Sequence, residues 1–501
     1  MESLTPVGES IRDRLKAAYG GRRALVLGLG LSNNPVIDQL VLAGADVTAA
    51  DRKTREQFGA SYANLTRYPI RLVLGPGYLR AIEGQEVIFL TPGIRRDLPE
   101  IEAARLRGVP MSSEMRLFFE LCPAPVVGIT GSAGKTTTTT LVGLMLQAAR
   151  GGVWVGGNIG RPLLGEVELM APGDLAVVEL SSFQLQDLGQ SPQVAAVLNV
   201  SPNHLDMHPS MEHYITAKKN IYLHQEAGGA AVFGFDNPVT RDMAAEYYTT
   251  VSKGWGGAGP VLFGRRQGDG CAAFVHGEEL ILDLASREAG LPGGVICRRQ
   301  DLQLLGEHNV DNVLAAATVA GLAGAGLEAI RGVAITFTGV EHRLEPVGEV
   351  EGVQYYNDSI ATAPDRTIAA LRALPAPLVL ILGGYDKRIG FDELAHEILR
   401  SRKVRAIVLT GDTAPQIRAS LERAADELAG QATQATPFAP PELVAAGDFA
   451  AAVAAARRAA QPGDAVALSP ACASYDSFAN FEERGRTFKQ LVASLARGSI
   501  S

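Results

Sequence analysis

The sequence contains few cysteines, and their spacing argues against both a zinc site and a disulfide framework. Only 4 cysteines occur among 501 residues, and no two of them form a C-x-x-C pair. They stand at Cys122, Cys271, Cys297 and Cys472. Cysteines so far apart supply neither a zinc-ligand set nor a disulfide framework. We therefore expect isolated thiols in a reducing compartment.

The sequence also lacks an excess of positive charge and long apolar runs. It has 46 basic and 54 acidic residues, a net charge of −8, which leaves little basic surface for nucleic acid. No apolar run approaches the roughly 20 residues that cross a bilayer. The first six residues have neither the basic start nor the apolar stretch of a signal peptide. We expect a cytoplasmic monomer that binds neither nucleic acid nor membrane.

What is present is a pattern of apolar strand, glycine-rich turn and helix that recurs along the chain. Apolar strands that alternate with helices indicate parallel sheets covered on both faces, and the length suits about three domains. We predict an α/β fold of three domains, each on a largely parallel sheet, with antiparallel strands added to the middle domain between about 230 and 300. The predicted domains are residues 1–122, 123–338 and 339–501. Strands are expected at residues 24–30, 46–51, 126–130, 175–180, 194–200, 378–384, 404–410 and 465–469.

The first glycine-rich turn has part of a dinucleotide-binding pattern. Gly28-x-Gly30-x-x-Asn33 follows a strand, and Asp51 stands about 20 residues on, where a ribose partner is expected. Asn33 replaces the third glycine, which predicts looser packing of helix on strand. A helix N-terminus here suits any diphosphate, including that of a UDP-sugar. A tight turn without a ligand remains the alternative.

The second turn predicts a nucleotide site. A strand runs into Gly131-Ser132-Ala133-Gly134-Lys135-Thr136-Thr137. Ile129 stands where the strict Walker pattern has glycine, yet the loop amides can still face phosphate oxygens. Lys135 can reach the β- and γ-phosphates of ATP, and the Thr136 hydroxyl can bind Mg²⁺. Thr136 opens a run of five threonines that is expected to begin a helix.

Two polar clusters that follow strands in the same domain favour a magnesium site. Glu179 ends one strand, and the second cluster runs from Asn199 to Asp206. Mg²⁺ prefers oxygen, so Glu179 is a more natural ligand than His204, for which a core histidine is the alternative. His204 and His208 do not make a zinc pair, because Pro209 follows and no third ligand is evident. Spacing alone does not single out Lys218.

Taken together, these segments resemble the Mur ligases. The resemblance rests on residues 130–136, Gly156-Gly157-Asn158-Ile159-Gly160 and Asn203-His204-Leu205-Asp206, and it covers essentially the whole chain in the family's order. Further segments look like the family's glutamate-adding members. These are residues 179–185, 306–309, 342–343, 357–359 and 468–481.

The resemblance implies an enzyme that uses ATP and Mg²⁺ to join D-glutamate to UDP-N-acetylmuramoyl-L-alanine through an acyl phosphate. It implies catalytic roles for Lys135, His204 and Lys218, and Lys218 matches the family's carbamylated lysine. Thr136, Glu179, His204 and Lys218 would hold the metal. ATP would meet residues 131–137 with Asn309, Arg343 and Asp358. The UDP-sugar would meet Leu31, Ser32, Asp51 and Asn158, and glutamate would meet Thr362, Lys387, Ser474 and Phe481.

The sequence departs from the family pattern at two positions. Ala133 replaces an asparagine often found in the phosphate loop, which removes a side-chain hydrogen bond but no backbone amide. Ile360 stands where many members have lysine, so the choice between D- and L-glutamate stays open. Three competing functions also fit parts of the sequence. They are a sister ligase such as folylpolyglutamate synthase, a nicotinamide-dependent oxidoreductase built on Gly28 and Gly30, and a nucleotide switch that makes no bond.

Overall fold

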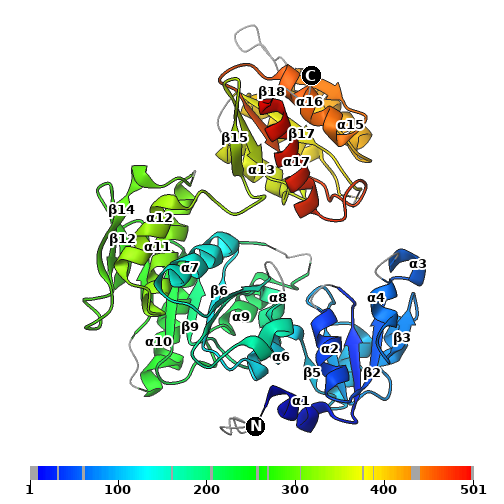
Figure 1. Cartoon of the computed structure of the whole chain (residues 1–501), viewed down its shortest axis with the longest axis vertical. Coiled ribbons are helices and arrows are strands. Elements are labelled where there is room, and N and C mark those ends of the chain that lie inside the picture. Colours follow the sequence, from blue (N-terminus) through cyan, green and yellow to red (C-terminus); the bar gives the residue numbers. More distant parts are fainter. Residues whose placement is uncertain are drawn as a thin grey trace. The chain divides into compact units, whose positions relative to one another are not determined.

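The computed structural model describes most of the chain. It covers residues 10–497 except 31–32, 59–61, 159–161, 204–206, 256–258, 268–269, 305, 375–376, 387–388 and 430–439. Four residues with expected ligand roles therefore lie outside the described residues, namely Leu31, Ser32, His204 and Lys387. Figure 1 shows three α/β regions in the described chain, each built around one sheet. The predicted α/β class with largely parallel sheets is confirmed.

The first sheet is parallel throughout, with the strand order β3-β2-β1-β4-β5. Its strands are β1 (Arg23–Leu27), β2 (Asp46–Asp51), β3 (Arg71–Leu74), β4 (Val87–Leu90) and β5 (Met111–Ser112). The helices around it are α1 (Ile11–Tyr19), α2 (Asn34–Leu42), α3 (Arg55–Phe58), α4 (Tyr62–Thr66), α5 (Pro99–Leu106) and α6 (Glu114–Leu121). Residues 24–27 of β1 are fully buried, as an apolar central strand requires.

The second sheet has the order β14-β13-β12-β11-β10-β9-β6-β8-β7. Its strands are β6 (Val126–Thr130), β7 (Val153–Gly157), β8 (Leu175–Glu179), β9 (Val194–Val197), β10 (Ala230–Gly234), β11 (Val261–Phe263), β12 (Cys271–His276), β13 (Glu279–Asp283) and β14 (Gly293–Arg298). The strands from β7 to β12 are parallel, and β12, β13 and β14 are antiparallel. The predicted antiparallel addition is confirmed for its last three strands, whereas β10 and β11 continue the parallel sheet.

The second α/β region contains six α-helices within the described residues, and two of them pack closely. They are α7 (Lys135–Ala149), α8 (Ser182–Leu185), α9 (Met211–Lys219), α10 (Pro238–Thr250), α11 (Glu307–Leu322) and α12 (Leu327–Thr336). Helix α11 is buried along most of its length, from Val310 to Gly321 with Asp311 as the partial exception. Gly143 lets α7 approach strand β7 closely, because a Cβ there would collide with Val155. Helix α7 begins where the sequence predicts, at the run of threonines.

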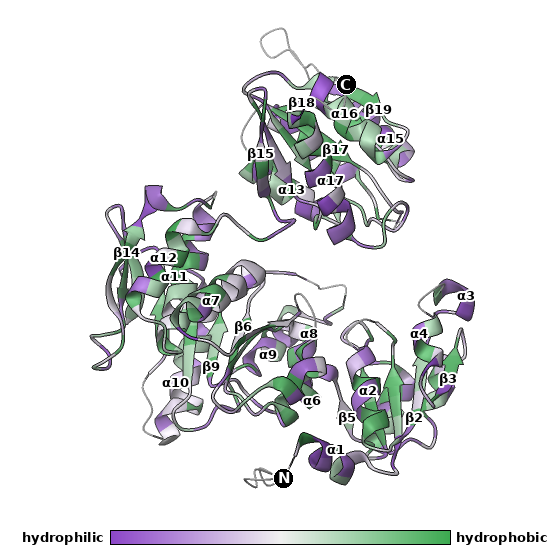
Figure 2. Cartoon of the chain, in the orientation of Figure 1, coloured by the Kyte–Doolittle hydropathy of each residue, from purple (hydrophilic) through white to green (hydrophobic). Residues whose placement is uncertain are grey.

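The third sheet has the order β15-β16-β20-β17-β18-β19. Its strands are β15 (Glu345–Val350), β16 (Val353–Asn357), β17 (Leu378–Leu382), β18 (Val404–Leu409), β19 (Glu442–Ala445) and β20 (Ala465–Leu468), and β15 pairs with β16 as an antiparallel hairpin. The helices are α13 (Pro364–Ala373), α14 (Asp392–Ser401), α15 (Ala414–Ala429), α16 (Phe449–Ala459) and α17 (Phe481–Ala496). Leu380 and Leu382 of β17 point into one core, and Val379 and Ile381 point into the other. Figure 2 shows β17 as hydrophobic, as expected for a strand covered on both faces.

The chain divides into two compact units. One comprises residues 1–302 with 307–336, and the other comprises residues 303–306 with 337–501. The first two predicted domains thus lie in one unit except for residues 303–306 and 337–338, and the predicted boundary at 338/339 lies near the division at 336/337. The exact domain bounds stay a prediction. Within the described residues, no helix combines the length and the apolar character that a membrane crossing needs.

Candidate active site

The phosphate-loop candidate joins strand β6 to helix α7, as the sequence predicts. Gly134 is the N-terminal cap residue of α7 and has a φ of 81°, in the left-handed region that favours glycine. A Cβ at Gly134 would also collide with Asn312 Oδ1. The first N–H groups of a helix have no acceptor within the helix, and no side chain caps this end of α7. Such a helix end can bind anionic oxygens, including those of a nucleoside triphosphate.

Asn199, which follows strand β9, holds the phosphate loop in place through hydrogen bonds. Its Oδ1 accepts a hydrogen bond from the Ala133 N–H at 2.9 Å, and its Nδ2 donates to the Ala133 carbonyl at 3.1 Å. The Ser132 N–H donates to the Asn199 carbonyl at 2.9 Å. These bonds use the backbone of residue 133, so alanine at that position keeps them. The polar cluster predicted after this strand therefore includes a residue that shapes the phosphate loop.

Lys135 lies across the loop that it follows. Its Nζ donates to the Gly131 carbonyl at 3.0 Å and to the Ser132 carbonyl at 3.3 Å. The side chain is half-buried, so the ammonium is held at the loop while it stays accessible. A cation held at an anion-binding helix end is suited to the charge that develops on a transferred phosphoryl group.

An oxygen cluster lies at the carboxyl end of strand β8, beside the start of α7. The Thr136 hydroxyl donates to Glu179 Oε2 at 2.8 Å, and Asn158 Nδ2 donates to Glu179 Oε1 at 2.8 Å. Glu179 is only 2% exposed. Among the described residues no group of three His, Cys, Asp or Glu side chains is placed to hold a metal, and the candidate ligand His204 lies outside them. A hydroxyl and a carboxylate oxygen fit the preferences of Mg²⁺.

Lys218 of helix α9 lies buried directly beneath the phosphate loop. It is 1% exposed, and its Nζ donates to the Gly131 carbonyl at 3.0 Å and to Thr130 Oγ1 at 3.3 Å. Burial and the positive charge of Lys135 lower the pKa of Lys218 well below that of an ordinary lysine, against the opposing effect of Glu179. The sequence gives no sign of this, because Lys219 looks equivalent. Lys219 instead forms an ion pair with Glu246.

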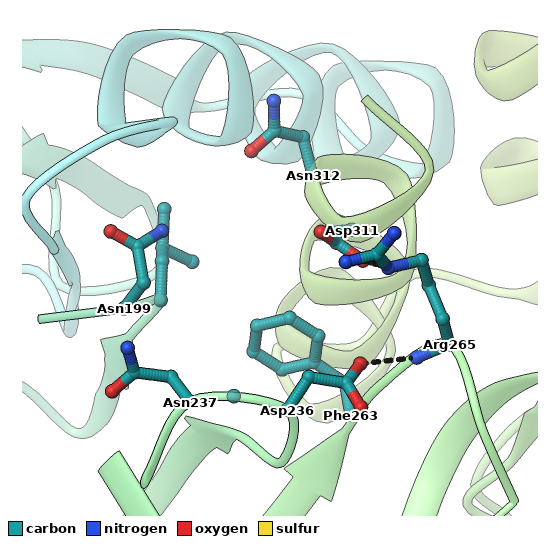
Figure 3. Close-up of a pocket in the computed structure, with 9 residues that line it drawn as sticks. Asn199, Asp236, Asn237, Phe263, Arg265, Asp311 and Asn312 are labelled. Atoms are coloured by element: carbon teal, nitrogen blue, oxygen red, sulfur yellow. Dashed lines mark hydrogen bonds and ion pairs between the residues drawn. The ribbon is translucent and has the colours of Figure 1, made fainter. Parts of the chain in front are cut away.

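A pocket opens beside the phosphate loop, and the sequence did not predict it as a whole. Figure 3 shows polar side chains from several segments around it, with the ring of Phe263 among them. Arg265 Nε pairs with Asp311 Oδ1 at 3.0 Å, and the Arg265 N–H donates to Asp236 at 2.7 Å. Burial raises the pKa of Asp311 to about 6, although Arg265 opposes the shift. The residues that line it are Leu198, Asn199, Gly234, Asp236, Asn237, Phe263, Arg265, Asp311 and Asn312.

One of these pocket residues, Asn312, connects the pocket with two predicted positions. Asn312 Nδ2 donates to Asn309 Oδ1 at 2.9 Å, so Asn309 borders the pocket through its neighbour on α11. Asn312 is also the residue against which Gly134 packs. The signal that could have revealed the pocket is that polar residues come shortly after strands β9 and β10, since the carboxyl ends of parallel strands share one edge.

The first glycine-rich turn is braced by side chains in a comparable way. Asp51, at the end of β2, accepts hydrogen bonds from the Leu29 N–H at 2.7 Å and from the Lys53 N–H at 2.8 Å. Asn33 is fully buried, and its Nδ2 donates to the Gly28 carbonyl at 2.6 Å. The sequence predicted looser packing at Asn33, but the side chain instead ties the turn back to its strand. Leu31 and Ser32 lie outside the described residues.

In the third α/β region, Asp358 is buried just beyond the end of strand β16. Ser469 Oγ donates to Asp358 Oδ2 at 2.8 Å, and the Leu344 N–H donates to Oδ1 at 3.2 Å. Burial raises the pKa of Asp358 to about 7, and the charges of Arg343 and Arg366 act in the opposite direction. A carboxyl group that titrates near neutral pH at a sheet edge is a candidate functional group.

One buried arginine connects segments next to the predicted glutamate residues Ser474 and Phe481. Arg484 is 2% exposed and donates to the carbonyls of Ser359 at 2.8 Å, Ala473 at 3.1 Å and Cys472 at 3.1 Å. Ser359 Oγ in turn donates to the Phe481 carbonyl at 2.8 Å. Arg484 therefore joins the segment before Thr362 to the segment that carries Ser474. Sequence reasoning missed Arg484, and Lys387 lies outside the described residues.

Comparison with known proteins gives this arrangement a family. A family model described as Mur ligase middle domain matches residues 129–320, and one described as Mur ligase, glutamate ligase domain matches residues 342–472. A protein of Symbiobacterium thermophilum named UDP-N-acetylmuramoylalanine–D-glutamate ligase is 48% identical over 476 residues, which are 95% of this chain and 98% of that protein. The chain belongs to the Mur ligase family. A ligase of the same name from Acetivibrio thermocellus is 44% identical over 96% of this chain and 98% of its own length.

Solved Mur ligases share the fold at much lower identity. The UDP-N-acetylmuramate–alanine ligase MurC of Thermotoga maritima aligns with a TM-score of 0.55 at 19% identity, over 94% of this chain and 99% of that one. MurF of Acinetobacter baumannii aligns with a TM-score of 0.53 at 18% identity, over 96% of this chain and 92% of that one. These likenesses concern the fold alone.

The two Mur ligase matches correspond to the two polar sites. The middle-domain match extends from strand β6 into α11 and so includes the phosphate loop, Glu179, Lys218 and the pocket. The glutamate-ligase match includes Asp358 and ends at Cys472, which Arg484 contacts. The ligand roles of individual residues stay predictions.

Proposed function

We propose that this Mur ligase joins D-glutamate to UDP-N-acetylmuramoyl-L-alanine in a reaction driven by ATP, a step of peptidoglycan precursor synthesis in the cytoplasm. The observation that carries the proposal is the full-length identity of 48% to a ligase named for this reaction. The site supports it independently, because the phosphate loop, an acidic oxygen cluster and a second polar site all lie on one chain. The reaction needs a nucleotide, an acceptor carboxylate and an amine.

ATP fits the phosphate loop and the pocket beside it. The triphosphate would meet the first N–H groups of α7, with Lys135 as the neutralising cation. The pocket that contains Phe263 and Asn312 would receive the base and ribose, and Asn309 borders it. Asparagine amides can both donate to and accept from a base edge, and the phenyl ring offers an apolar face.

Mg²⁺ would be held by Thr136 and Glu179, with His204 as a further candidate, and it would neutralise charge on the phosphate oxygens. Lys218 is suited to carbamylation, in which its neutral amine adds CO₂ and releases a proton. Its lowered pKa increases the fraction of reactive amine, and the product is a carboxylate that can also bind the metal. Mass spectrometry of intact protein, in buffer with and without bicarbonate, should detect the added CO₂ in wild type and not in Lys218→Met.

In the reaction, the alanyl carboxylate of the UDP-sugar attacks the γ-phosphate of ATP, which gives an acyl phosphate and ADP. The amine of glutamate then attacks the acyl carbon, and phosphate leaves as the amide forms. Lys135 and the loop amides stabilise the negative charge that develops on the phosphoryl oxygens. Asp51 and Asn158 are proposed to hold the UDP-sugar, while Thr362, Lys387, Ser474 and Phe481 hold the glutamate.

The decisive test measures ADP release with UDP-N-acetylmuramoyl-L-alanine as acceptor. D-Glutamate, L-glutamate, lysine and diaminopimelate are offered in parallel, and a folate acceptor is tested with L-glutamate. We expect ADP release to depend on both the muramyl acceptor and D-glutamate. Turnover with L-glutamate or with the folate would instead indicate a sister ligase, and NADH binding without ADP release would indicate an oxidoreductase.

A further inference from the structure

The first turn of helix α13 is fixed to the edge of the third sheet beside Asp358. Thr367 Oγ1 donates to the Ser469 carbonyl at 3.0 Å, and Ser469 Oγ lies 3.1 Å from Thr367 Oγ1. The same Ser469 hydroxyl donates to Asp358. Thr367 and Ser469 are fully buried, so the start of α13 has a defined position relative to the carboxyl ends of β16 and β20.

Arg366 immediately precedes Thr367 and is exposed. Its guanidinium forms no hydrogen bond or ion pair with any residue that the structure describes. Its charge nevertheless acts on Asp358, whose pKa it lowers against the effect of burial. Arg366 therefore brings positive charge to the sheet edge without being neutralised there by a described carboxylate.

The position of Arg366 is not explained by the stability of its helix. Residues 364–366 form the first turn of α13, where the helix dipole favours acidic side chains and disfavours cations. Asp365 is the residue there that suits the dipole. By contrast, Arg372 lies in the last turn of the same helix, as the dipole favours, and pairs with Glu397 at 2.8 Å.

The neighbouring side chains Ile360 and Arg484 do not supply an accessible positive charge. The turn that follows Asp358 carries Ile360, which is apolar and half-buried. Arg484 is charged but buried, and its guanidinium donates hydrogen bonds to oxygens of the protein. Arg366 is exposed whereas Arg484 is buried, and Arg366 lies in the first turn of α13, which begins shortly after Thr362.

We propose that Arg366 binds the substrate carboxylate that enters this edge of the third sheet, and that it is a specificity-determining residue for the amino acid. This inference rests on the proposed function, in which the amino acid is glutamate. A guanidinium is suited to the task because its fork of N–H donors matches the two oxygens of a carboxylate. A phosphate oxygen has the same chemistry, and the experiment distinguishes the two sources.

The test compares Arg366→Gln, Arg366→Lys and the control Arg372→Gln, which removes an exposed arginine from the same helix. We expect Arg366→Gln to raise the KM for glutamate about tenfold, the loss of one charged hydrogen-bonding partner. The KM values for ATP and for the UDP-sugar should stay unchanged, and Arg366→Lys should recover part of the loss. Thermal unfolding should show no destabilisation, because a cation leaves the helix N-terminus.

A second variant tests whether charge at this edge is what matters. Ile360→Lys combined with Arg366→Gln places a new cation on the adjacent turn and should lower the glutamate KM again. The proposal is overturned if Arg366→Gln behaves like Arg372→Gln. A raised KM for ATP alone would reject the carboxylate and assign Arg366 to phosphate. If wild-type enzyme releases no ADP with D-glutamate, the proposed function itself fails, whatever the variants do.

Discussion

Two glycine-rich turns in this chain share one architecture and differ in chemistry. Each joins a central parallel strand to a helix, and each is braced by a side chain at or just beyond the end of a neighbouring strand. Asp51 accepts from the first turn at the Leu29 N–H, and Asn199 accepts from the second at the Ala133 N–H. The topology thus supplies a positioned helix N-terminus twice.

The difference lies in what the helix brings to that position. Helix α2 starts with Asn34 and Pro35, and proline removes one of the N–H groups that could face an anion. Helix α7 starts with Lys135 and Thr136, keeps its N–H groups and lies above the buried Lys218. The first turn is equipped to hold a ligand, whereas the second can also stabilise developing charge.

The largest effect should follow from removing the cation that distinguishes the second turn. Lys135→Ala should lower kcat at least about a hundredfold, the usual scale for losing one preorganised stabiliser of transition-state charge. ADP release at saturating substrates measures it. Lys16→Ala, which removes an exposed lysine of α1, is the control and should match wild type. Near-normal turnover in Lys135→Ala would contradict the claim that the second turn, unlike the first, stabilises developing charge.

The next effect concerns the glycines that shape the turns. Gly134→Ala combines left-handed strain with a collision at Asn312, and Gly28→Ala combines the same strain with a collision at Thr91. We expect Gly134→Ala to raise the KM for ATP about tenfold or more, and Gly28→Ala to raise that for the UDP-sugar instead. Gly108 has a similar φ of 79° with open space around it, so Gly108→Ala reports strain alone. Identical effects of the first two variants on both substrates would contradict separate roles.

Smaller changes should come from the bracing side chains. Asp51→Ala and Asn199→Ala each remove a hydrogen-bond acceptor from a loop N–H, which costs about 1 kcal/mol, roughly fivefold in affinity. The first should raise the KM for the UDP-sugar, and the second that for ATP. Asp51→Asn keeps an acceptor oxygen and serves as the matched control. If Asp51→Asn is as impaired as Asp51→Ala, the negative charge matters more than the brace.

The turns themselves could be predicted, because apolar strands and glycine spacing are local properties. The predicted strands at residues 126–130 and 378–384 correspond to β6 and β17, and Glu179 does end its strand. The metal-site prediction depended on a general rule, that the carboxyl ends of parallel strands share an edge. The rule already included Asn199, and it could have been extended to Asn237, which lines the same pocket.

The rest depends on contacts between residues far apart in sequence. Lys218 meets Gly131 across 87 positions, and Arg484 meets Ser359 across 125. Nothing around either residue in the sequence signals its burial, since neighbouring lysines or arginines look the same. Asn33 was misjudged for a related reason, because its hydrogen bond to Gly28 depends on the geometry of the folded turn.

The smallest expected effect is a pH dependence of stability that belongs to the second turn alone. Lys218 lies beneath that turn, and its folded-state pKa is below the ordinary value for lysine. Between those two values the unfolded chain binds a proton that the folded chain does not, so stability rises as pH rises and falls as pH falls.

Lys218→Met should flatten this slope, and Lys219→Met, which removes a lysine paired with Glu246, should not. Thermal midpoints measured in CO₂-free buffer from neutral pH toward the ordinary lysine pKa should differ by a few degrees, about 2–4 °C for each kcal/mol. Equal slopes in all three proteins would mean that Lys218 stays charged in the folded state, which would also remove the basis for its carbamylation.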